Sequence, residues 1–208
     1  MPLTVVEHPL VAHKLALLRD RRTTTKEFRH LVAELAALLT YEATRDLGTE
    51  PIEVETPLAR TTQRKVSGKK LAVVPVFRAG LGMLDAVLDL IPVARVGFVG
   101  LYRDEETLEP VEYYAKFPAD LEQRRVLLID PMLATGGSTS AACGLLKEGG
   151  AGRITVICLV AAPEGVERVA ADHRDVHVVA AALDRQLNED GYIVPGLGDA
   201  GDRLYGTR

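Results

Sequence analysis

The sequence predicts an α/β fold with a doubly wound, mostly parallel central sheet flanked by helices. Apolar runs of strand length alternate along the chain with segments of helical spacing. Two of these runs, 71–77 (LAVVPVF) and 126–129 (VLLI), are apolar throughout, which is typical of strands buried on both faces of a parallel sheet. Each is followed by a loop with small residues and then by a helical pattern, as in βαβ units.

The size and composition of the chain indicate one globular domain. A chain of 208 residues is long enough for one α/β domain and too short for two ordinary ones, so we treat 1–208 as a single domain. Its net charge of -4 offers no general attraction to nucleic acid or anionic membranes. Neither a signal peptide nor an apolar stretch near 18 residues is present, and Cys143 and Cys158 lack metal or redox spacing. We therefore expect a cytoplasmic protein without nucleic-acid or membrane partners.

Residues 1–50 are expected to form a helical appendage. Apolar residues recur at helical spacing over 8–20, and a second helix is expected after Thr24, which forms a capping box with Glu27. The second helix carries one apolar stripe, made of Phe28, Leu31, Val32, Leu35, Leu38 and Leu39. Because both helices precede the first expected strand, this stripe needs a partner, and we hypothesise a subunit interface. Alternation at 51–57 then predicts a half-buried strand, followed by a polar edge or loop (RTTQRKVSGKK).

The loop after the apolar run 126–129 predicts a phosphate site. The run ends in Asp130, and small or polar residues follow until helix-compatible residues resume at Ala141. The glycine pair Gly136–Gly137 lets backbone N–H groups turn toward an anion, and the helix adds its unpaired N-terminal donors. Hydroxyl donors come from three neighbours, Thr135, Ser138 and Thr139.

Asp130 lies at the carboxyl end of its strand, where open α/β sheets bind ligands. A carboxylate beside an anion site repels phosphate unless it has another partner, and vicinal sugar hydroxyls are such a partner. The combination suggests a ribose 5-phosphate. The residues alone also allow an ordinary strand-to-helix turn in which Asp130 caps the helix.

Three further segments carry candidate chemistry. Arg78 and a glycine-containing loop follow the run 71–77, forming a second strand-loop-helix anion site. A hairpin is expected from strands near 93–102 and 111–116, with an acidic tip. The C-terminal stretch is too rich in glycine for a regular helix or a long strand. Its G-x-G-x-x-G at 196–201 is not a dinucleotide motif, because no βαβ unit follows it.

Four strings occur in the order typical of one enzyme family: VPVFRAG, YRDEETLEP, DPMLATGGS and YIVPGLGDAGDR. Together they resemble the type I phosphoribosyltransferases, in the form of the uracil phosphoribosyltransferase branch. Pro131 stands where most of that superfamily has a second acid, which favours the uracil branch over the purine and orotate branches. By this resemblance, 100–118 is a hairpin lid over the active site and 186–208 is a uracil-binding hood.

The resemblance implies a reaction in which uracil and 5-phospho-α-D-ribose 1-diphosphate (PRPP) give UMP and diphosphate, as in pyrimidine salvage. It implies catalytic roles for Asp130, Arg103 and Asp199. The residues expected to bind PRPP are Arg78, Arg103, Asp130, Pro131, Met132, Leu133, Ala134, Thr135, Gly136, Gly137, Ser138 and Asp199. The residues expected to bind uracil, largely through main-chain groups, are Ile193, Gly198, Asp199 and Ala200.

The resemblance also implies partners and leaves one alternative from another class. Mg²⁺ is the expected cofactor, carried by substrate phosphates, and the sequence identifies no protein ligand for it. Some members of the family respond to GTP and assemble as dimers or tetramers, so GTP is a candidate effector and a homo-oligomer is expected. The alternative is a non-catalytic regulator that keeps the fold and binds PRPP or UMP.

Overall fold

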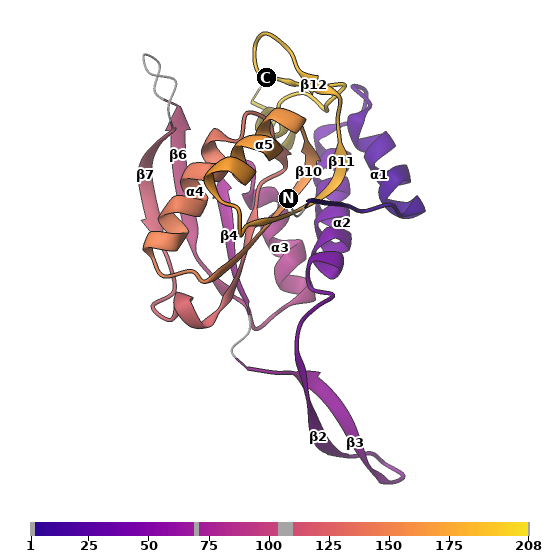
Figure 1. The fold of residues 1–208 in the computed structure, drawn as a ribbon. Helices are drawn as coiled ribbons and strands as arrows, with labels where there is room; N and C mark the ends of the chain where they lie inside the picture. Colours follow the sequence, from indigo (N-terminus) through magenta and orange to yellow (C-terminus); the bar gives the residue numbers. More distant parts are fainter. Residues whose placement is uncertain (1–2, 69–70, 104–109, 208) are drawn as a thin grey trace.

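The computed structural model describes residues 3–68, 71–103 and 110–207. Within these ranges a central sheet runs in the order β1-β11-β10-β8-β4-β6-β7, and all neighbours along it are parallel except β6 and β7 (Figure 1). The bounds along this path are β1 (Leu3–Val5), β11 (His177–Leu183), β10 (Arg153–Ala161), β8 (Arg125–Ile129), β4 (Leu71–Phe77), β6 (Phe98–Arg103) and β7 (Pro110–Lys116). Two short strands join its sides, β5 (Arg95–Val96) on β4 and β9 (Met132–Leu133) on β10.

Helices cover both faces of this sheet, so the expected doubly wound architecture is confirmed. One face carries α1 (Pro9–Arg19), α2 (Thr25–Ala43) and α3 (Leu81–Leu90), and the other carries α4 (Gly137–Glu148) and α5 (Pro163–Asp172). In β8, Leu127 and Ile129 belong to the first core, whereas Val126 and Leu128 belong to the second. Successive side chains of a strand point to opposite faces, so a strand covered on both sides must be apolar throughout.

The second N-terminal helix begins where its sequence predicts, but its apolar stripe packs against a partner other than the expected one. The Thr24 hydroxyl accepts from the Glu27 N–H, and the Glu27 carboxylate accepts from the Thr24 N–H at 3.0 Å, which completes the capping box. Phe28 and Leu35 have no exposed surface within the single chain. The apolar stripe is therefore buried against α3 and the sheet, and our hypothesis that it waits for a second subunit is wrong.

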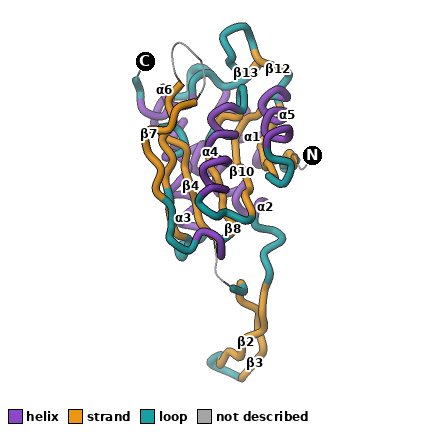
Figure 2. Tube along the Cα trace, turned by 60° about the vertical axis from the view of Figure 1, so that its left-hand side comes forward, coloured by secondary structure: helices purple, strands orange, loops and turns teal. Residues whose placement is uncertain are grey.

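Two features of the N-terminal quarter were not predicted. Residues 3–5 form β1, which pairs in parallel with β11, so the two helices do not precede the first strand of the sheet. A strand of three residues is too short to show a periodicity. The polar stretch expected to be an edge or loop is also a strand, β3 (Arg60–Val66), paired antiparallel with β2 (Thr49–Glu55). This two-stranded arm projects away from the sheet (Figures 1 and 2), so polar residues are tolerated on both of its faces.

The hairpin formed by β6 and β7 confirms the expected strands around 93–116. A short 3-10 turn, η1 (Leu121–Gln123), leads from β7 into β8. The acidic tip of the predicted lid, residues 104–109, lies outside the described residues. Both cysteines are buried and unpaired, as predicted. None of the helices in the described ranges has the length and apolar character needed to cross a bilayer.

Leu35→Ala tests the packing of α2. Leu35 is fully buried, so the truncation should lower the free energy of unfolding by about 3 kcal/mol, measured by urea denaturation followed by circular dichroism. Leu10→Ala is the matched control, because Leu10 is 52 % exposed on α1. If the two variants lose equal stability, α2 does not pack as described.

Candidate functional site

The segments that carry the candidate site residues leave the same edge of the sheet. Strand β4 pairs in parallel with β8, with Pro75 opposite Ile129, and β8 pairs in parallel with β10. Arg78 therefore follows β4 at the edge where Asp130 follows β8. The C-terminal segment lies at this edge as well, at the top of Figure 1. The tertiary structure thus brings both predicted anion sites and the glycine-rich segment to one end of the molecule.

The chain after β8 is more regular than expected. Pro131 accepts hydrogen bonds from the backbone N–H groups of Leu159 and Val160, and β9 then continues beside β10. Helix α4 begins at Gly137 rather than near Ala141, so our expectation of a loop through residues 138–140 is wrong. Gly136, with φ 79°, turns the chain directly into the helix, a conformation that favours glycine. The N-terminal turn of α4 therefore faces this edge of the sheet directly.

Helix α5 presses against this turn. A side chain at Gly165 would place its Cβ 2.3 Å from the carbonyl oxygen of Ala134, so only glycine permits this approach. Arg168, three residues further along α5, lies with Nη1 3.5 Å from where a Cβ on Gly137 would stand. It helps to line a cavity of about 220 Å³, whose wall is formed by Pro110, Ala134, Thr135, Gly137, Ser138, Arg168 and Gly191.

Arg168 is a site residue that the sequence analysis missed. It lies 30 residues beyond Ser138, on a helix whose polar positions are expected to face solvent. Only the packing of α5 on the α4 turn brings its guanidinium to the cavity. No sequence signal short of the structure itself could have identified it.

Asp130 has an environment unlike that of a surface carboxylate. Burial of its carboxyl group raises the pKa from 3.8 to about 7, although a hydrogen bond from the Met132 N–H partly opposes the shift. Its backbone N–H donates to Ile157 at 3.1 Å, which holds it in line with the sheet. A half-buried acceptor at a ligand-facing edge favours a ligand that brings its own hydroxyl donors.

The segment after β4 approaches both β8 and the C-terminal residues. A Cβ on Gly80 would lie 2.5 Å from the carbonyl oxygen of Ile129, so the loop needs glycine there. The carbonyl oxygen of Arg78 accepts a hydrogen bond from the Tyr205 hydroxyl at 2.9 Å. The guanidinium of Arg78 lies 4.0 Å from where a Cβ on Gly201 would stand. Arg78 is therefore placed between the sheet edge and the C-terminal segment.

The C-terminal segment, residues 186–208, is called the hood below. It contains a small antiparallel pair, β12 (Gln186–Leu187) and β13 (Ile193–Val194), and one short helix, α6 (Ala200–Tyr205). The expectation that this stretch is neither a regular helix nor a long strand is confirmed apart from the 6 residues of α6. Helix α6 forms because the Asp199 carboxylate caps it, accepting from the Asp202 N–H at 2.9 Å, and because Leu204 is buried.

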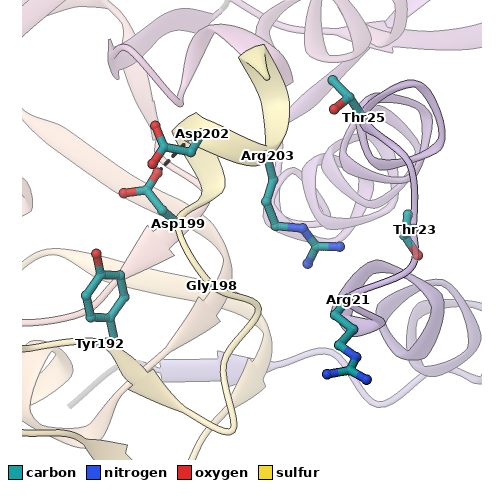
Figure 3. Close-up of a pocket in the computed structure, with 8 residues that line it drawn as sticks. All are labelled: Arg21, Thr23, Thr25, Tyr192, Gly198, Asp199, Asp202 and Arg203. Carbon is teal, nitrogen blue, oxygen red and sulfur yellow. Dashed lines mark hydrogen bonds between the residues drawn. The ribbon is translucent and has the colours of Figure 1, made fainter. Parts of the chain in front are cut away.

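The hood borders a second cavity, of about 440 Å³, shown in Figure 3. Tyr192, Asp199 and Asp202 lie on one side of it, and Arg21 and Arg203 lie on the other. Of the four residues expected to bind uracil, Gly198 and Asp199 line this cavity. The other two, Ile193 and Ala200, are 4 % and 3 % exposed. Their side chains are therefore turned into the core, and main-chain groups are what they can offer a ligand.

The structure brings most of the predicted site residues together but does not describe the side chain of Arg103. Those in or beside β9, the α4 turn and the hood all lie at the same edge of the sheet. Arg103 is the last residue of β6, and its side chain lies outside the described part of the structure. Among the described residues, no three His, Cys, Asp or Glu side chains are arranged to hold a metal ion.

Comparisons with known proteins agree with this geometry. The family model for uracil phosphoribosyltransferase matches residues 5–207. The chain belongs to the uracil phosphoribosyltransferase family. It is 58 % identical over 203 residues to a uracil phosphoribosyltransferase of Clostridium botulinum, covering 98 % of this chain and 97 % of that one. It is 60 % identical over 205 residues to that of Lacticaseibacillus paracasei, covering 99 % and 98 %.

Solved structures share the fold of this family member. The AQ2163 protein from Aquifex aeolicus superposes with a TM-score of 0.93 at 37 % identity, covering 99 % of this chain and 98 % of that one. Adenine phosphoribosyltransferase from Trypanosoma brucei, solved with AMP, pyrophosphate and ribose-5-phosphate, gives a TM-score of 0.60 at 13 % identity, covering 96 % of this chain and 89 % of that one. The second likeness concerns the fold alone.

The raised pKa of Asp130 predicts a pH-dependent effect of Asp130→Asn on stability. In the unfolded chain this carboxyl ionises near its ordinary pKa of 3.8, whereas in the folded protein it ionises near 7. The folded state thus holds the extra proton between these values, and stability falls as pH rises through this window. Asparagine has no ionisable side chain, so the stability of the variant does not fall in this way as pH rises. The advantage of the variant should grow by roughly 1 to 3 kcal/mol from pH 5 to pH 8.

Urea unfolding of the ligand-free protein at both pH values measures this difference. Asp85→Asn, on the exposed side of α3, controls for the loss of one negative charge. A stability difference between Asp130→Asn and the parent protein that is constant from pH 5 to pH 8 would contradict the assignment.

Proposed function

We propose that the protein transfers the 5-phosphoribosyl group of PRPP to N1 of uracil, giving UMP and diphosphate. The observation that carries the proposal is the position of the Asp130 carboxyl group, beside the N-terminal turn of α4 and at the same sheet edge as the hood. This arrangement offers a sugar-binding carboxylate, an anion site and a base site at one edge of the sheet. Membership of the uracil phosphoribosyltransferase family supports it and does not favour a non-catalytic regulator.

In this proposal the α4 turn anchors the 5-phosphate. Backbone N–H groups at the start of a helix point outward unpaired, and the helix dipole adds a partial positive charge. The groups that contact the phosphate and the adjoining ribose come from one run, Pro131, Met132, Leu133, Ala134, Thr135, Gly136, Gly137 and Ser138. Asp130 accepts hydrogen bonds from the ribose hydroxyls, which favours its ionised form once substrate is bound.

Arg78 and Arg103 bind the diphosphate. As the bond between the anomeric carbon and the diphosphate lengthens, positive charge grows on the ribose and negative charge on the leaving group. Fixed cations that face the leaving oxygens stabilise this state more than the ground state. The described residues offer no activated nucleophile paired with a base, so direct displacement by uracil is proposed.

Mg²⁺ fits this site as a partner of the substrate. Without a cluster of protein ligands among the described residues, the donor set is the diphosphate oxygens and water, an arrangement that Mg²⁺ accepts. When bound, the ion would offset charge on the departing diphosphate. Asp199 Oδ1 and Arg78 Nη2 lie 3.2 Å and 4.0 Å from where a Cβ on Gly201 would stand, so the two side chains are close together. From there Asp199 could reach the diphosphate region through water. Its carboxylate already caps α6, so one of its oxygens is committed to the fold.

Base choice is assigned to the main chain of the hood. Uracil presents two carbonyl acceptors on either side of the N3–H donor, whereas cytosine has an amino donor beside a bare N3 acceptor. The groups that would distinguish them belong to Ile193, Gly198, Asp199 and Ala200. A backbone pattern complementary to uracil leaves buried groups unpaired with cytosine. GTP activation, a homo-oligomeric state and a salvage role stay predictions from the resemblance, and a cytoplasmic location stays a prediction from the sequence.

The direct test is nucleotide formation from PRPP and Mg²⁺ with uracil, cytosine, orotate, hypoxanthine and adenine supplied separately. We expect UMP from uracil and discrimination against cytosine on the order of 10⁴-fold in kcat/KM. A metal-free reaction serves as the control and should be inactive. No nucleotide from any base, with PRPP or UMP still bound, would overturn the proposal in favour of a regulator.

Arg168→Gln tests the cavity beside the α4 turn. Losing this guanidinium removes a positive charge next to the proposed 5-phosphate, so KM for PRPP should rise about tenfold while KM for uracil changes less than about threefold. Arg174→Gln is the matched control, an exposed arginine just beyond the end of α5. If both variants have the same steady-state constants, Arg168 does not contribute to PRPP binding.

A further inference from the structure

A buried ion pair lies directly behind the hood and involves none of the expected site residues. Arg19, the last residue of α1, donates to both carboxylate oxygens of Asp184, at 2.7 and 2.6 Å. Asp184 follows β11, and its side chain is only 5 % exposed. The two residues are 165 positions apart in the sequence. A two-pronged pair of this kind fixes orientation as well as distance.

The pair holds both backbone polar groups of one hood residue, Gly196. The Gly196 N–H donates to the Asp184 carboxylate at 2.8 Å, and the Gly196 carbonyl oxygen accepts from Arg19 at 2.7 Å. Each charged residue thus bonds twice with its partner and once with Gly196. The result is a closed arrangement in which the orientation of this backbone unit is set by two side chains from outside the hood.

Gly196 in turn has almost no freedom relative to Ile193. It adopts φ 59°, and a Cβ placed on it would lie 2.1 Å from the carbonyl oxygen of Ile193. The backbone of Gly196 is therefore packed directly onto a main-chain group of the expected uracil site. On its other side, Leu197 leads into Gly198, the next expected uracil residue. A shift at Gly196 must move one or both of these contacts.

We propose that Arg19 and Asp184 are positioning residues for base recognition, which set the main-chain pattern of the hood without touching substrate. This inference depends on the proposed function, because it assumes that the hood binds uracil. The side chains of the pair bond to the hood at Gly196, whereas the α4 turn and Asp130 are held mainly by β9, β10 and α5. The hood reaches the cavity beside the α4 turn elsewhere, at Gly191, so we expect the pair to affect the base site most.

A second arginine reinforces the link between the hood and α1. Arg203 donates to the carbonyl oxygens of Leu197, Leu18 and Asp20, and its guanidinium lies 4.3 Å above the ring of Phe28. The carbonyls at the end of α1 are thereby tied to the hood at neighbouring points. Helix α1 is thus an anchor for the hood, a role that the sequence alone did not indicate.

Asp184→Asn is the first test. It retains the shape of the side chain but removes the charge, so Arg19 loses its ionic partner and turns from Gly196. We expect KM for uracil to rise about tenfold, with KM for PRPP within about twofold of the parent value. In titration calorimetry, affinity for UMP should fall about tenfold while affinity for ribose 5-phosphate stays within about twofold, because only UMP carries the base.

A second variant covers the case in which Asp184→Asn does not fold. Arg19→Lys keeps the positive charge but cannot make the paired contact, and it should give the same selective loss for uracil and UMP. Glu42→Gln is the matched control. Glu42 also makes a two-pronged contact with an arginine, Arg45, but at the end of α2 opposite to the hood, so its ligand constants should not change.

The outcomes separate this inference from the proposed function. If the parent protein makes UMP but both variants lose affinity for ribose 5-phosphate and UMP equally, or for neither, the positioning role is wrong. If the parent protein makes no UMP and binds UMP no better than ribose 5-phosphate, the proposed function itself fails. A selective loss for the base in either variant supports the inference.

Discussion

The parallel pairing of β4, β8 and β10 is the constraint on which the rest of the structure depends. Because the strands run the same way, their carboxyl ends meet at one edge, and each chain segment that leaves this edge begins beside the others. Helices on both faces shield the strands from water, so the strands are largely apolar. Polar side chains are therefore rare inside these strands, with Thr155 of β10 as an exception, and Arg78 and Asp130 follow the last residues of β4 and β8.

Close backbone contacts turn this shared edge into a shaped site. Gly165 lets α5 reach the carbonyl of Ala134, and Gly80 lets the segment after β4 reach that of Ile129. A single methyl group at either position would force the elements apart. The same packing surrounds Asp130 and raises its pKa to about 7. The protein thus tolerates a half-buried carboxyl group at the edge where ligands of open α/β sheets bind.

The hood is held in place by different contacts from those that hold the α4 turn. The α4 turn depends on the sheet and on α5, whereas the hood is held by side chains that reach it from α1 and from the end of β11. The two parts are thus positioned by different contacts, although Gly191 of the hood also lines the cavity beside the α4 turn.

The amino-acid sequence by itself determined the fold class, the capping box of α2, the hairpin strands β6 and β7, and the family to which the chain belongs. These depend on local patterns, such as an apolar run ending in Asp130 or Thr24 followed by Glu27. Only the tertiary structure decided that α4 begins at Gly137, that Arg168 lines the cavity beside the α4 turn, and that Arg19 pairs with Asp184. Such contacts join residues far apart in the chain, and their existence depends on how helices pack rather than on any spacing within the sequence.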